Sequence, residues 1–125
     1  MNAKKIASTV LSMGVVIAVA VGFKLYNMAG ASSEVQEEVY AILPQLTDHT
    51  RDPAYFRTLV DENHEEVFKR SYDAGGRRRA ATFERKQYFG DLHAAMVEQA
   101  QRDGRSWVGR SLRRGKQLFV AAGQR

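Results

Sequence analysis

The stretch that decides the architecture runs from Ile6 to Phe23 and reads IASTVLSMGVVIAVAVGF, without one charged side chain. A helix of this length spans roughly 27 Å, close to the hydrocarbon core of a bilayer at about 30 Å. Leu25, Tyr26 and Met28 extend the apolar character. The pattern therefore predicts a single transmembrane helix over residues 6–28.

A cleaved secretory signal is the alternative interpretation of this stretch. Lys4 and Lys5 precede it, and Ala29-Gly30-Ala31 is an acceptable small-residue cleavage site. The apolar region of a secretory signal is shorter, about 7–15 residues. The length of the run therefore favours a retained anchor.

Charge on the two flanks predicts the orientation of this helix. The amino terminus, Lys4 and Lys5 lie before it, whereas Lys24 and then acidic residues follow it. Basic residues near the ends of a membrane helix favour the cytoplasmic side. We therefore expect residues 1–5 to be a short cytoplasmic tail in an inner (plasma) membrane protein. The remainder of the chain would then lie in the periplasm.

Helical periodicity dominates the rest of the 125 residues. We expect a linker over residues 29–33 and an all-α domain of three or four amphipathic helices over 34–125. A 3.6-residue apolar stripe from Val35 to Leu46 predicts the first helix, which Pro44 should end near Ile42. Asp52-Pro53 predicts the next helix start, and Gly75-Gly76 its end. Further helices are expected over 77–102 and, after Ser106, over 107–122.

Two surfaces of this chain are predicted to bind partners. In the membrane helix, small residues recur every four positions and would admit a helix of another integral membrane subunit. The last segment combines aromatic and aliphatic side chains with arginines, which suits an acidic protein surface or anionic lipid. The predicted partner-binding residues are Gly14, Ala18, Gly22, Trp107, Arg110, Arg113, Arg114, Leu118 and Phe119.

Charge is divided between the two halves of the domain. Residues 30–73 hold ten acidic and four basic side chains, and residues 74–125 hold four acidic and twelve basic ones. A basic half ordinarily suggests nucleic acid, but the expected periplasmic location argues against that partner. Arg77-Arg78-Arg79 after Gly75-Gly76 is a weak phosphate-binding pattern, and the two glycines indicate a helix stop equally well.

Evidence for catalysis is sparse in this sequence. It contains no cysteine, no phosphate-binding Gly-rich motif and no nucleophile elbow. Asp61, His64 and Glu65 would share one helical face, a spacing that di-iron bundles use twice with two further carboxylates; no second copy is present. We therefore predict no catalytic, cofactor or metal site. The expected function is that of a non-enzymatic accessory, structural or assembly subunit of a larger membrane complex; the alternative is a metal-binding or enzymatic module built on these three residues.

The predicted orientation can be tested at Ser33, because the chain has no native cysteine to interfere with labelling. In a Ser33→Cys variant, a membrane-impermeant maleimide is expected to react in intact spheroplasts. An Ala3→Cys variant should react only after the membrane is permeabilised. The reverse pattern would show that the domain is cytoplasmic.

Overall fold

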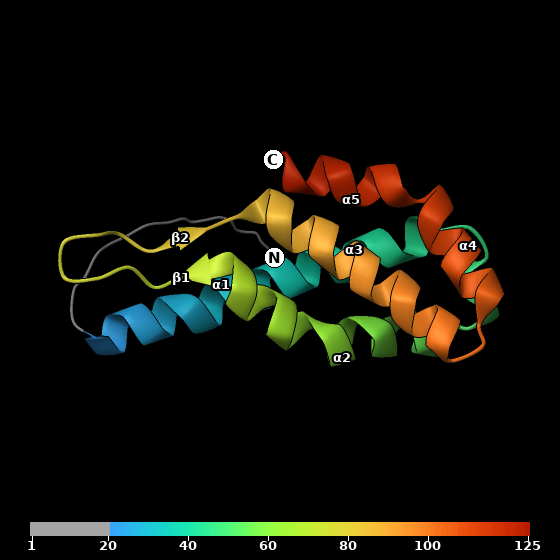
Figure 1. Ribbon diagram of the computed structural model, residues 1–125, viewed down its shortest axis with the longest axis horizontal. Helices are drawn as coiled ribbons and strands as arrows, with labels where there is room; N and C mark the ends of the chain where they lie inside the picture. Colours follow the sequence, from blue (N-terminus) through green and yellow to red (C-terminus); the bar gives the residue numbers. More distant parts are fainter. Residues whose placement is uncertain (1–20) are drawn as a thin grey trace.

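The computed structural model describes residues 21–125, and the side chains of residues 28–125. This part of the protein is mostly helical (Figure 1). Its elements are α1 (Val21–Ile42), two short 3₁₀ turns (Leu43–Gln45 and His49–Arg51), α2 (Pro53–Ser71), β1 (Tyr72–Asp73), β2 (Thr82–Phe83), α3 (Arg85–Arg102), α4 (Ser106–Arg114) and α5 (Lys116–Gly123). The all-α prediction is confirmed at this level.

Helix α3 lies at the centre of the arrangement. It packs against α2, α4 and α5, and α1 packs against α2 and α5 (Figure 1). Each helix turns an apolar stripe inward, and fully buried side chains such as Phe56, Leu59, Phe89, Leu92 and Leu112 form one continuous core. Burial of such stripes is the main force that holds short helices together.

The membrane helix predicted over residues 6–28 lies mostly outside the described residues. Within residues 21–125, none of the helices combines the length and the apolar character needed to cross a bilayer. Gly14 and Ala18 are not described, whereas Gly22 belongs to α1. The transmembrane segment, its orientation and its glycine face therefore stay predictions.

The linker expected over residues 29–33 is wrong, because α1 continues through it without a break. Alanine is the strongest helix former, and it offsets the weak propensity of Gly30. Tertiary contacts add to this: Met28 and Ala31 pack against the core, and Ser32 is hydrogen-bonded to His64 on α2. Pro44 does end the helix as predicted, since α1 stops at Ile42.

The predicted start of α2 is confirmed in detail. The side chain of Asp52 accepts a hydrogen bond from the backbone N–H of Tyr55 at 3.2 Å, and Pro53 is the first helical residue. Arg105 also donates to Asp52 at 2.9 Å and lies over the Tyr55 ring. Tyr55 in turn donates to Asp103 at 2.6 Å. This network fixes the α2 start against the α3–α4 turn.

A β-hairpin takes the place of the first two turns predicted for the third helix. β1 and β2 pair antiparallel, with Tyr72 opposite Phe83. The ring centroids of Tyr72 and Phe83 lie 5.2 and 5.3 Å from that of Phe68 on α2. These contacts, together with a bond from the Glu84 N–H to the Ser71 carbonyl, favour strands over continued helix. Helix α3 therefore begins at Arg85 rather than Arg77.

The single C-terminal helix predicted over residues 107–122 is also wrong, since Gly115 separates α4 from α5. A Cβ atom at Gly115 would lie 2.3 Å from a methyl carbon of Leu46. The missing side chain lets the chain turn closely over the first 3₁₀ turn, so that α5 folds back along α3.

Alanine substitutions at Gly115 and Gly109 should therefore have opposite effects on stability. Gly115→Ala forces Leu46 aside, and overpacking of this kind costs about 1–3 kcal/mol. Gly109→Ala meets only the guanidinium tip of Arg113, at 3.8 Å or more, and should gain up to about 1 kcal/mol from helix propensity. Urea unfolding in mild detergent measures both. Equal effects would show that Leu46 does not constrain the turn.

Candidate functional site

The cluster predicted as a possible metal site has a structural role instead. His64 is 6% exposed and lies between two hydroxyl groups. Its Nε2 is 2.7 Å from the Ser32 hydroxyl on α1, and its Nδ1 is 2.6 Å from the Tyr88 hydroxyl on α3. Both ring nitrogens are thus engaged, and neither is left for a metal ion.

The two acidic members of that cluster point elsewhere. Asp61 accepts hydrogen bonds from Gln36 and Tyr40 on α1, and Glu65 forms an exposed ion pair with Lys69 at 3.5 Å. Among residues 21–125, no three histidine or acidic side chains come close enough together to hold a metal ion. Asp61 and His64 are thus both engaged by residues of α1, His64 also by Tyr88 of α3, and Glu65 pairs with Lys69 on α2.

Burial lowers the pKa of His64 below its ordinary value, because the charged imidazolium loses solvation. Nearby Glu65 and Asp61 oppose this shift only in part. Burial likewise raises the pKa of Tyr88. Both groups are therefore neutral at pH 7, and the imidazole donates one hydrogen bond and accepts the other.

The C-terminal segment, α4 and α5, has an apolar inner face and a basic outer face. Phe119 is 1% exposed and packs against the His93 ring, with 5.0 Å between the centroids. Trp107 packs edge-on against Phe56, and the guanidinium of Arg51 covers its ring at 4.0 Å. Leu118 is half-buried against the core. Phe119, and in part Trp107 and Leu118, thus contribute to the domain core, and the partner-binding role of these three side chains stays a prediction.

The predicted arginines, in contrast, lie on the outer face of α4. Arg110, Arg113 and Arg114 are exposed, and Lys116 follows at the start of α5. None of these four takes part in an ion pair of 4 Å or less within the described chain. A surface that combines several unpaired cations without apolar side chains favours a polar, acidic partner.

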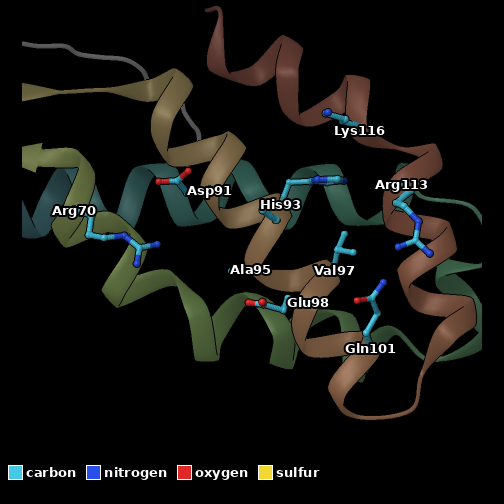
Figure 2. Close-up of a pocket in the computed structure, with 10 residues that line it drawn as sticks. Arg70, Asp91, His93, Ala95, Val97, Glu98, Gln101, Arg113 and Lys116 are labelled. Atoms are coloured by element: carbon cyan, nitrogen blue, oxygen red, sulfur yellow. The ribbon is translucent and has the colours of Figure 1, made fainter.

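A groove that the sequence did not reveal borders this basic face. It is open to solvent, has a volume of about 840 Å³, and is lined along α3 by Ala94, Ala95 and Val97. Figure 2 shows Arg113 and Lys116 on the α4–α5 side and Arg70 on the α2 side. Asp91, Glu98, His93 and Gln101 complete the lining. The small residues at successive positions of α3 were the only sequence signal for it.

His93 occupies the wall of the groove that faces α4. It is 8% exposed, and its Nε2 lies 2.7 Å from the carbonyl oxygen of Leu112. Because a carbonyl only accepts, Nε2 carries the proton and Nδ1 keeps its lone pair when the ring is neutral. Burial lowers the pKa of His93, and Lys116 and Arg113 lower it further against the opposing effect of the Leu112 carbonyl. The groove thus presents three cations (Arg70, Arg113 and Lys116), two carboxylates (Asp91 and Glu98) and a short apolar floor to a ligand.

Comparison of the chain with protein-family models, with curated proteins and with solved structures finds no match.

The two buried histidines should make the domain sensitive to acid. Their pKa values in the folded state lie below the ordinary value of about 6.5. As the pH falls through 6.5, the unfolded state therefore takes up these protons first, and the free energy of unfolding decreases. Urea unfolding at pH 7.5 and pH 5.5 should show lower stability at pH 5.5.

A His64→Gln, His93→Gln double variant provides the control for this pH dependence. Glutamine retains hydrogen-bonding capacity without titrating. The variant should lose most of the difference between the two pH values, even if its stability at pH 7.5 is lower. An unchanged difference would assign the acid sensitivity to other groups. The low pKa of Asp52 contributes only near pH 4 and below, outside this interval.

Proposed function

We propose that this protein is a membrane-anchored, non-enzymatic subunit of a larger membrane protein complex, whose helical domain presents a basic face to an acidic partner protein. One observation carries the proposal. Within the described residues, α1 runs from Val21, inside the apolar run of residues 6–23, to Ile42. Val35 and Val39 on the same helix are buried in the domain core. The anchor would thus lead into the domain along one helix, and hold it at a set height above the bilayer.

The position of the basic face argues for a protein partner over lipid. The Ser111 hydroxyl on α4 donates to the carbonyl of Thr47, beyond the C-terminal end of α1. From Lys24 to Ile42, α1 rises roughly 27 Å. At physiological ionic strength, exposed charges interact over about 8 Å. The α4 arginines would therefore lie too far from the membrane at the Val21 end to sense its lipids.

The chemistry of the domain supports binding rather than catalysis. His64 is held between two hydroxyls, and the larger apolar side chains of α4 and α5 other than Val120 pack in or against the core. The exposed arginines and the adjoining groove are the features left for a ligand. An extended acidic segment of a partner would place carboxylates against Arg113 and Lys116 and small side chains over Ala95 and Val97.

Charge reversal at the α4–α5 junction tests this proposal. In Arg113→Glu, Lys116→Glu, two favourable contacts become repulsive, and recovery of the protein in its complex should fall by about tenfold. The control is Lys69→Glu, Lys86→Glu, which makes the same change in net charge on α2 and α3. Size-exclusion chromatography in mild detergent, with quantitative mass spectrometry of the co-eluting subunits, measures recovery.

A second arm of the same experiment addresses the membrane contact. Gly14→Leu removes the close approach expected of the Gly14, Ala18, Gly22 face, and should also reduce recovery. If both this charge reversal and Gly14→Leu leave recovery at the wild-type level, the protein is a free-standing anchored domain. Deletion of residues 105–125 is not a suitable test, because it would remove Leu112 and Phe119 from the core.

A further inference from the structure

The groove along α3 has two rows of lining residues, because positions three or four apart lie on the same side of a helix. One row, Asp91, Ala95 and Glu98, lies on the side of α2, where Arg70 completes the lining (Figure 2). Two of these charges have partners within the domain, since Glu98 pairs with Arg102 at 3.4 Å and Arg70 with Glu66 at 3.6 Å. Charges of both signs are therefore mixed on the α2 side of the groove.

The second row lies beside unpaired positive charge. His93, Val97 and Gln101 are on the side of α4 and α5, and the His93 ring lies between the side chains of Arg113 and Lys116 (Figure 2). Neither cation forms an ion pair of 4 Å or less within the described residues. Besides burial, Lys116 and Arg113 lower the pKa of His93, so the fields of both cations reach the ring. The α4–α5 side of the groove is thus a region of positive potential.

A glycine on α4 gives the guanidinium of Arg113 its position. A Cβ atom at Gly109, one turn earlier, would lie 3.8 and 3.9 Å from the two terminal nitrogens of Arg113. The guanidinium therefore lies back over the backbone of α4. Arginine binds a carboxylate through two parallel hydrogen bonds, and a guanidinium that already lies against the helix loses less freedom when it does so.

The ring of His93 has one nitrogen left for a ligand. Its Nε2 donates to the Leu112 carbonyl at 2.7 Å, and no group within the described residues bonds Nδ1. In the same part of the chain, the one side-chain polar atom that is both buried and without a partner is Nε of Arg85, so Nδ1 of His93 is reached by solvent. Protonation turns this nitrogen from an acceptor into a donor.

We propose that the α4–α5 side of the groove binds an aspartate or glutamate side chain of the partner protein, with protonated His93 as a third contact beside Arg113 and Lys116. This inference rests on the proposed function, which assigns an acidic partner to this face, and it adds a dependence on pH. At pH 7.5 the imidazole is neutral, and the two permanent cations bind the carboxylate. As the pH falls, a proton on Nδ1 supplies a further charge-assisted hydrogen bond, and binding becomes tighter.

Acid therefore acts in opposite directions on the free domain and on the complex. Burial and the two neighbouring cations lower the pKa of His93 in the free domain. A bound carboxylate offsets the field of these cations, so the pKa of His93 is higher in the complex, and affinity rises as the pH falls between the two values. The other charged groups that line the groove, Arg70, Asp91 and Glu98, lie on its α2 side, and none of them is among the charges that shift His93.

Histidine NMR of the full-length protein in detergent micelles tests this inference. The chain has three histidines, so carbon-13 labelling at Cε1 gives three signals, which single His→Gln variants assign. The probe is a short capped alanine peptide with one central glutamate, and the matched control peptide carries glutamine instead. The glutamate peptide should raise the titration midpoint of His93 and leave that of His64, which lies outside the groove, unchanged. The glutamine peptide should move neither.

Substitutions assign the binding to the three groups, with affinity measured from the backbone amide shift of Val97. Wild-type protein should bind the glutamate peptide about tenfold more tightly at pH 5.5 than at pH 7.5, and His93→Gln equally at both. Arg113→Ser, Lys116→Ser should lose binding at both pH values. Arg77→Ser, Arg78→Ser removes the same charge at the other end of the domain (Figure 1) and should bind as wild type does. Acid also weakens the fold, but unfolding only reduces binding, so it cannot produce the gain.

The proposed function and this inference fail on different results. Absence of peptide binding at both pH values would overturn the carboxylate site. Equal affinity at the two pH values, or a pH dependence that persists in His93→Gln, would overturn the role of His93 and leave the acidic partner in place. Wild-type recovery of the complex after Arg113→Glu, Lys116→Glu would instead overturn the acidic partner, whatever the peptide does.

Discussion

Three helices of this domain meet at one buried imidazole, and the arrangement of the rest depends on that junction. His64 on α2 joins Ser32 on α1 to Tyr88 on α3 by hydrogen bonds of 2.7 and 2.6 Å. An unsatisfied buried polar group costs about 1–3 kcal/mol. A shift of α1 or α3 would leave two such groups without a partner, one ring nitrogen of His64 and the hydroxyl that it contacts. The junction thereby sets the register of α1 against α2, which determines which features lie at each end of the bundle.

That register gives the molecule two chemically different ends. The N-terminal end of α1 lies with the hairpin and its arginines, and the C-terminal end lies with α4 and its exposed basic face. Ion pairs between Glu38 and Arg85 and between Asp52 and Arg105 join segments that are distant in sequence, at 2.6 and 2.9 Å. Part of the acidic charge of the first half is therefore used to hold the basic second half in place. The remaining cations gather at the two ends.

The last segment shows why sequence pattern alone was ambiguous about binding. Aromatic and aliphatic residues on one face with arginines on the other describe a helix lying in a membrane interface, and equally a helix packed on a protein core. In the structure this segment packs on the protein core, because Leu112 and Phe119 are buried and Trp107 contacts both Phe56 and Arg51. Arg110, Arg113 and Arg114 stay exposed. For His64 too, the sequence showed the spacing to Asp61 but could not show its hydrogen-bond partners, Ser32 on α1 and Tyr88 on α3.

By itself, the sequence determined the elements whose signals are local. The helix cap at Asp52-Pro53, the stop at Pro44, the helical class and the inward stripes follow from backbone chemistry and 3.6-residue periodicity, and these were predicted correctly. The transmembrane helix expected from the uncharged run of residues 6–23 stays a prediction, because it rests on composition alone. Tertiary structure decided the remainder: the helix through residues 29–33, the hairpin, the break at Gly115 and the groove along α3. Each depends on contacts between residues far apart in the chain, such as Ser32 with His64, Phe68 with Phe83, and Gly115 with Leu46. Local propensity differs by only about 1 kcal/mol per residue at such positions, so packing chooses between the alternatives.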